Sequence, residues 1–155
     1  MNYSSAQIVL QEVPNEISLC FTICGCPLKC DGCHSPFLWK ESAGLNLNHQ
    51  ILDDYLTKYD GLISCVVFMG GEWHEDELIS FLTFVKRKNL KTCLYTGQEN
   101  VPNNLKIHLD YLKTGPWIKS LGGLANETTN QRFIEVKSNK ILNHLFNTKH
   151  YDKIN

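Results

Sequence analysis

Strand-like and helix-like segments alternate along most of this chain, and that alternation constrains its fold more than any other feature of the sequence. Residues 17–23 alternate and are rich in β-branched side chains, so they read as a strand. The continuous apolar run LISCVVFM (62–69) predicts a strand buried on both faces, and LKTCLYTG (90–97) predicts a third. LDYLKTG (109–115) and RFIEVK (132–137) indicate a fourth and a fifth strand.

Amphipathic segments separate these strands. Apolar residues recur at helical spacing up to Tyr59 with Asn48 as the N-cap, a second helix is expected over 75–88, and a short one within 101–109. The alternation predicts a parallel α/β sheet with right-handed crossovers. A complete eight-unit barrel takes about 250 residues. We therefore expect a partial (β/α) barrel, a mostly parallel sheet of about five or six strands, forming the single domain 1–155.

Composition excludes several classes of function. The 155 residues carry 15 Lys and Arg against 16 Asp and Glu, spread along the chain, so no nucleic-acid partner is expected. No apolar run approaches the roughly 20 residues of a membrane span, and no secretion signal is apparent. Seven cysteines, an odd number, then favour reduced thiols in a cytoplasmic protein. The polar tail from about Asn147 is expected to be disordered.

Three cysteines follow the first strand as C-x3-C-x2-C: Cys26, Cys30 and Cys33. Their convergence in a short loop predicts a metal site, and structural zinc or iron-sulfur sites usually use four protein ligands. Three ligands would leave one iron of a cluster open to another molecule. The alternative is a zinc knuckle completed by Cys24 or His34, although no second ligand pair lies farther along the chain. Cys24 either joins the site or simply ends the strand.

Polar and glycine residues follow the other predicted strands. Gly70, Gly71 and Glu72 close the run 62–69, Thr96 ends the next strand, and Lys113 ends the fourth. In a parallel sheet the carboxyl ends of the strands meet at one edge, where ligands bind. We therefore expect these residues beside the cysteine loop, where a carboxylate can hold an ammonium group.

The cysteine loop and the GGE turn together resemble the radical S-adenosylmethionine superfamily. The resemblance implies that the three cysteines hold a 4Fe-4S cluster whose fourth iron takes the amino and carboxylate groups of S-adenosylmethionine. It also implies that Gly70, Gly71 and Glu72 bind the cofactor, to which Thr96 and Lys113 are assigned as well. Electron transfer from the cluster would then cleave the cofactor to a 5'-deoxyadenosyl radical.

Within that superfamily the chain is similar to the activating proteins of anaerobic ribonucleoside-triphosphate reductase. The similarity rests on the short chain, on CDGCHSPFLW (30–39) and on TTNQRFIEV (128–136), and it covers residues 19–136. It implies an oxidoreductase that makes a glycyl radical on the large reductase subunit, with a flavodoxin or ferredoxin as electron donor. Two positions depart from the superfamily: Gly32 stands where an aromatic residue is common, and Trp73 where proline usually follows GGE.

Several alternatives stay open. The chain could resemble an activase of the pyruvate formate-lyase type or a 7-carboxy-7-deazaguanine synthase, and outside enzymes it could be a zinc-stabilised binding module. Asn130, Gln131 and Arg132 either line the site, bind the partner or form an ordinary polar loop. Cys20, Cys65 and Cys93 lie in apolar runs and are expected to be buried as small hydrophobic side chains; these three are not candidate ligands.

Overall fold

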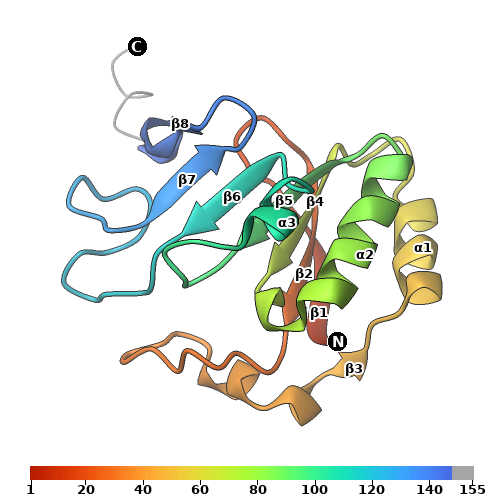
Figure 1. Cartoon of the computed structure of the whole chain (residues 1–155), viewed down its shortest axis with the longest axis horizontal. Helices are drawn as coiled ribbons and strands as arrows, with labels where there is room; N and C mark the ends of the chain where they lie inside the picture. The colour runs from red at the N-terminus through yellow and green to blue at the C-terminus, as the bar shows by residue number, and fades with distance from the viewer. Residues whose placement is uncertain (148–155) are drawn as a thin grey trace.

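A computed structural model describes residues 1–147 of the chain, and the expected disorder of the tail concerns residues that lie almost entirely outside this range. Its centre is one eight-stranded sheet with the order β3-β1-β2-β4-β5-β6-β7-β8 (Figure 1). Within residues 1–147, no helix is long and apolar enough to cross a membrane.

Most strands are short. The strands are β1 (Asn2–Val9), β2 (Ser18–Ile23), β3 (Leu45–Asn46), β4 (Cys65–Met69), β5 (Lys91–Tyr95), β6 (Tyr111–Thr114), β7 (Arg132–Glu135) and β8 (Lys140–Ile141). The α-helices are α1 (His49–Lys58), α2 (Glu75–Arg87) and α3 (Asn103–Lys106), and the 3-10 turns are η1 (Pro36–Trp39), η2 (Glu41–Ala43), η3 (Glu72–His74) and η4 (Asn143–Phe146).

The expected fold class, a partial (β/α) barrel with a mostly parallel sheet, is wrong. Strands β2, β4, β5 and β6 pair in parallel, but β1 pairs antiparallel with β2 and β3, and β7 pairs antiparallel with β6 and β8. The result is a mixed sheet of eight strands with few helices. The physical reason lies in the connections: β1 reaches β2, and β6 reaches β7, without an intervening α-helix, so these neighbours run in opposite directions.

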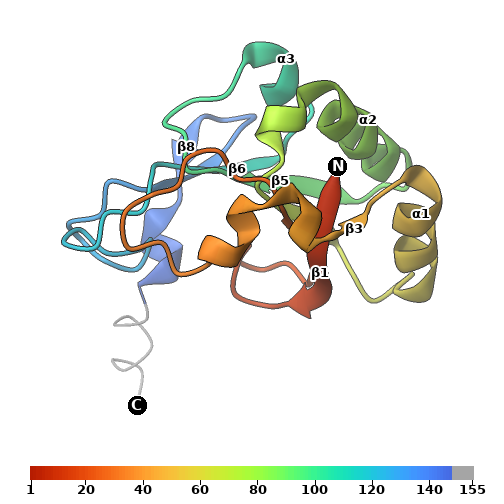
Figure 2. The same cartoon turned by 90° about the horizontal axis from the view of Figure 1, so that it is seen from below.

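The two faces of the sheet are covered differently. The three α-helices cover one face of the sheet (Figures 1 and 2). Alternate strand residues such as Phe21, Phe68 and Leu94 point to this face and pack against residues of the helices. Their neighbours point to the other face, where loop residues rather than α-helices cover them. This second core contains Val9, Val13, Cys20, Cys65, Val67, Cys93 and Phe133. The predicted burial of Cys20, Cys65 and Cys93 is thereby confirmed.

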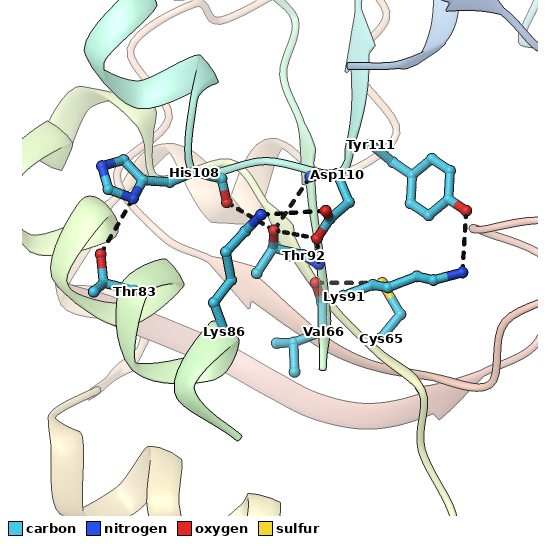
Figure 3. Close-up of polar contacts among 9 residues, drawn as sticks. All are labelled: Cys65, Val66, Thr83, Lys86, Lys91, Thr92, His108, Asp110 and Tyr111. Atoms are coloured by element: carbon cyan, nitrogen blue, oxygen red, sulfur yellow. Dashed lines mark hydrogen bonds and ion pairs between the residues drawn. The ribbon is translucent and has the colours of Figure 1, made fainter. Parts of the chain in front are cut away.

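A polar network fixes the amino-terminal ends of the central strands, away from the cysteine loop (Figure 3). Asp110 Oδ2 accepts the backbone N–H of buried Thr92 at 2.9 Å, and its Oδ1 accepts from Lys86 Nζ of α2 at 3.2 Å. The Thr92 hydroxyl donates to the carbonyl of His108 at 2.7 Å. The network thus ties α2, β5 and the start of β6 together.

Replacing Asp110 should lower stability without touching the site. We expect Asp110→Ala to reduce the free energy of unfolding by about 1–2 kcal/mol, because it leaves the Thr92 N–H without its acceptor. Urea unfolding followed by circular dichroism measures the change. The exposed Glu127→Ala serves as control and should stay within about 0.5 kcal/mol of the wild type; equal stability of the two variants would contradict the assigned role of Asp110.

Candidate functional site

The loop that follows β2 runs along the edge of the sheet toward which the parallel strands point (Figure 1). Two backbone bonds anchor its start: Gly25 N–H and Cys26 N–H both donate to the carbonyl of Leu38, at 2.7 and 3.1 Å. Gly25 (φ 91°) and Gly32 (φ 66°) adopt left-handed backbone, which glycine accommodates without strain. These turns hold the loop close to the sheet.

The three candidate ligands are half-buried, and none of them forms a disulfide: Cys26, Cys30 and Cys33. Cys26 and Cys33 line one cavity of about 170 Å3, together with Glu72 and Trp73. Burial is the main cause that raises the pKa of the Cys26 thiol, and the nearby Glu72 and Cys30 raise it further. Backbone N–H groups of Leu28 and Lys29 oppose this rise by donating to the Cys26 sulfur. The loop therefore already directs peptide donors at one of its sulfurs.

Cys24 belongs to a different environment from the other loop cysteines. It is fully buried, and its backbone N–H donates to the carbonyl of Asn2 in β1 at 2.8 Å. Its sulfur lies 2.8 Å from the position that a Cβ on Gly44 would take, and Cys24 is not among the residues that line the cavity of Cys26 and Cys33. Of the two readings left open by the sequence, the structure favours Cys24 as the end of a strand.

The GGE turn enters the same cavity from β4. Gly70 (φ 86°) and Gly71 (φ 106°) both occupy left-handed backbone, so a side chain at either position would strain the turn. A Cβ on Gly70 would lie 2.6 Å from the Trp73 ring, and one on Gly71 would lie 2.8 Å from the Met1 sulfur. Two consecutive glycines are therefore required both by the backbone and by packing.

Glu72 is the buried carboxylate of the site, with only 7% of its surface exposed. Its Oε1 accepts the hydroxyl of Thr96 at 2.6 Å, whereas its Oε2 is buried and has no hydrogen-bond partner among the described residues. Burial raises the pKa of Glu72, and the bond from Thr96 and the charge of Lys113 partly offset the rise. A half-satisfied carboxylate of this kind needs a further donor.

Thr96 and Lys113 lie beside Glu72 in different ways. The hydroxyl oxygen of Thr96 accepts the backbone N–H of Gln98 at 2.9 Å. This bond orients the hydroxyl so that its proton is donated to Glu72. Lys113 Nζ donates to the carbonyl of Gly115 at 2.9 Å, and burial lowers the pKa of Lys113 to about 8. Their assignment to the cofactor stays a prediction.

A second, larger cavity of about 860 Å3 adjoins the first, and Tyr95 lines both. Lys113 and Gln131, each more than nine-tenths buried, face this second cavity, and exposed Leu10 and Leu145 lie at its rim. The site therefore consists of two neighbouring spaces, one at the carboxyl edge of the parallel strands and one between the β1–β2 loop, which precedes β2, and the loop after β6.

The NQR segment divides between different surroundings. Gln131 lines the second cavity, Arg132 is exposed at the start of β7, and Asn130 donates from its side chain to the carbonyl of Pro116 at 3.0 Å. Only Gln131 of the three is thus placed at a cavity. His34 is exposed and packs on Trp117, with ring centroids 4.4 Å apart.

Sequence reasoning did not assign three aromatic residues to the site. Trp39, Trp73 and Tyr95 line the cavity of Cys26 and Cys33, but an aromatic residue in a loop or at a strand end gives no signal of its own. For Tyr95 the two-residue period of a strand gave a clue. It lies two residues after Cys93, so both side chains point to the loop-covered face, and it directly precedes Thr96. Trp73 differed from the superfamily pattern, which was the only hint available for it.

The donor set suits an iron-sulfur cluster. Thiolates are the ligands that such clusters use, and Cys26, Cys30 and Cys33 lie within eight residues of one loop. Among residues 1–147, no three Cys, His, Asp or Glu side chains are gathered closely enough to hold a metal ion. Because metal binding is coupled to ordering of the ligands, we expect the loop to close around a cluster. The unpartnered Glu72 oxygen indicates that a further donor belongs beside it.

Thiolate ligands are compatible with an iron-sulfur protein, and a family match supports this class. Residues 17–115 match the model of a family described as "4Fe-4S single cluster domain". This match spans more than half of the chain, so the protein belongs to that family, and the expected 4Fe-4S cluster is supported. A search of curated proteins found no match.

The cysteines can be tested individually, with Cys24 as the matched control. We expect the anaerobically reconstituted protein to be brown with about four irons per chain. Cys26→Ala, Cys30→Ala and Cys33→Ala should each lose most of this iron, whereas Cys24→Ala should keep it because the Cys24 sulfur packs beside Gly44 and Cys24 does not line the cavity. Iron analysis and the visible absorption band measure both effects. Loss of iron from Cys24→Ala with retention in Cys30→Ala would reverse the ligand assignment.

Proposed function

We propose that this protein is a radical S-adenosylmethionine activase that generates a glycyl radical on anaerobic ribonucleoside-triphosphate reductase. The observation that carries the proposal is the buried, unpartnered Oε2 of Glu72 in the cavity that also holds Cys26 and Cys33. A carboxylate held there can accept an ammonium N–H. The ammonium of S-adenosylmethionine, next to a cluster with only three protein ligands, supplies such a donor.

The chain's own residues would bind and orient the cofactor. Thr96 fixes one oxygen of Glu72 and leaves the other free, and the glycines of the turn let backbone approach closely. When bound, the cluster would supply the electron that cleaves S-adenosylmethionine. The first cavity alone is smaller than the roughly 300–1,000 Å3 of small-molecule sites. The cofactor would therefore extend past Tyr95 toward the second cavity.

The second cavity suits a segment of a protein substrate. It is open to solvent between the β1–β2 loop and the loop after β6, and its rim carries apolar Leu10 and Leu145. Deeper inside, the Gln131 amide can donate to a backbone carbonyl of an entering loop, whereas Lys113 stays assigned to the cofactor. The reductase segment that bears the glycine would bind there, with a flavodoxin or ferredoxin as reductant. Unpaired cysteines suit a cytoplasmic location for this chemistry.

Glu72 gives a direct test of cofactor binding. We expect Glu72→Gln to bind S-adenosylmethionine about 10- to 100-fold more weakly, because a charged hydrogen bond is replaced by a neutral one. Isothermal titration of the cluster-loaded protein measures the affinity, and iron content should not change. The exposed Glu127→Gln is the matched control and should bind as the wild type does. Equal affinity in both variants would remove Glu72 from the cofactor site.

The activase reaction is tested with the partner. We expect reduced, cluster-loaded protein mixed with the large reductase subunit and S-adenosylmethionine to give the doublet of a glycyl radical in electron paramagnetic resonance. Omitting S-adenosylmethionine should abolish the signal, and Glu72→Gln should slow its appearance at least 10-fold at subsaturating cofactor.

Failure of this reaction can be assigned to its source. Cofactor cleavage without any glycyl radical, from an intact and cluster-loaded pair, would keep the radical chemistry but contradict the reductase as substrate. A pyruvate formate-lyase-type partner would then be tested in the same way. A colourless protein with stoichiometric zinc would contradict the radical function altogether.

A further inference from the structure

All three tryptophans of the chain lie around the cysteine loop with their indole N–H groups unused. Nε1 of Trp39, Trp73 and Trp117 is buried in each case and has no hydrogen-bond partner among residues 1–147. A buried donor without an acceptor destabilises the folded state, so native proteins rarely keep one without a reason. Three such donors around one loop indicate that an acceptor belongs there.

Two of these donors approach the loop beside a candidate ligand. Nε1 of Trp73 lies 3.3 Å from the position that a Cβ on Gly25 would take, and Gly25 directly precedes Cys26. Nε1 of Trp117 lies 3.9 Å from the corresponding position on Gly32, which directly precedes Cys33. In both places a glycine lets the indole come close to the backbone next to a sulfur ligand.

Each ring is held in place by packing on the protein. The six-membered ring of Trp73 packs on Gly70 of the turn after β4, so the indole spans from that turn to the loop. Trp117, from the loop after β6, packs on His34 with ring centroids 4.4 Å apart. Trp39 lines the same cavity as Cys26 and Cys33 and follows Leu38, whose carbonyl anchors the loop. The donors thus come from three separate segments.

We propose that the indole N–H groups of Trp39, Trp73 and Trp117 donate hydrogen bonds to the sulfur atoms of the 4Fe-4S cluster and its cysteine ligands, and so raise its reduction potential. Hydrogen bonds to the sulfurs stabilise the more negative, reduced cluster and are one of the means by which proteins set its potential. No protein oxygen or nitrogen accepts these donors within the described residues, so they are free to donate to sulfur. These hydrogen bonds require the 4Fe-4S cluster that the family match supports, but they do not require the activase function.

Tryptophan-to-phenylalanine variants separate the donor from the ring. We expect Trp39→Phe, Trp73→Phe and Trp117→Phe each to shift the midpoint potential of the cluster to more negative values, with iron content kept near that of the wild type. Redox titration monitored by electron paramagnetic resonance, without S-adenosylmethionine, measures the shift. Tyr59→Phe, which removes a hydroxyl at the end of α1, is the matched control and should leave the potential unchanged.

A second measurement keeps the proposal testable if a variant loads no cluster. Wild-type protein labelled with 15N only in the indole nitrogen should show 15N hyperfine coupling to the reduced cluster, together with exchangeable protons that disappear in D2O. Unchanged potentials in all three variants, or no indole coupling in the wild type, would overturn the proposal. Coupling that appears only after S-adenosylmethionine is added would also overturn it, since the acceptor would then be the cofactor.

Discussion

The parallel pairing of β2, β4, β5 and β6 is the constraint on which the site depends. Its register sets Thr22 beside Met69, Met69 beside Tyr95, and Tyr95 beside Lys113, so the strands end at a common edge. Every candidate ligand of the site follows or ends one of these strands. The pairing thereby brings a loop at residues 24–35 and a turn at 70–72 into one cavity, although their sequence separation is large.

Sequence patterns predicted this central part well for a physical reason. Strands buried on both faces must be continuously apolar, as in CVVFM of β4, and the helices between them must carry an apolar stripe, as in α2 with Leu78, Phe81, Leu82 and Val85. The expected N-cap also forms, because Asn48 Oδ1 accepts the N–H of Ile51 at 3.0 Å. Local patterns as strong as these specify whether a segment forms a strand or a helix.

The edges of the sheet carried weaker signals, and the fold class was wrong because of them. β1 (NYSSAQIV) is mostly polar and only partly buried, so its pattern does not predict a strand, and β3 and β8 have two residues each. The direction of β7 follows from its connection to β6, which contains no α-helix, rather than from the composition of RFIEVK. Local pattern indicates that a segment is extended, whereas its partner and direction depend on tertiary contacts.

At the site, too, local sequence patterns predict some of the residues and not others. The spacing of the three cysteines and the pair Gly70-Gly71 are local and could be seen in the sequence, but the residues that complete the site are not. Trp117 reaches the backbone beside Cys33 from the loop after β6, and Trp73 reaches the backbone beside Cys26 from the turn after β4. Gly25 and Gly32 carry no side chains that would keep these indoles away. The position beside the third cysteine therefore has an aromatic neighbour in this protein too, supplied by a distant segment of the chain.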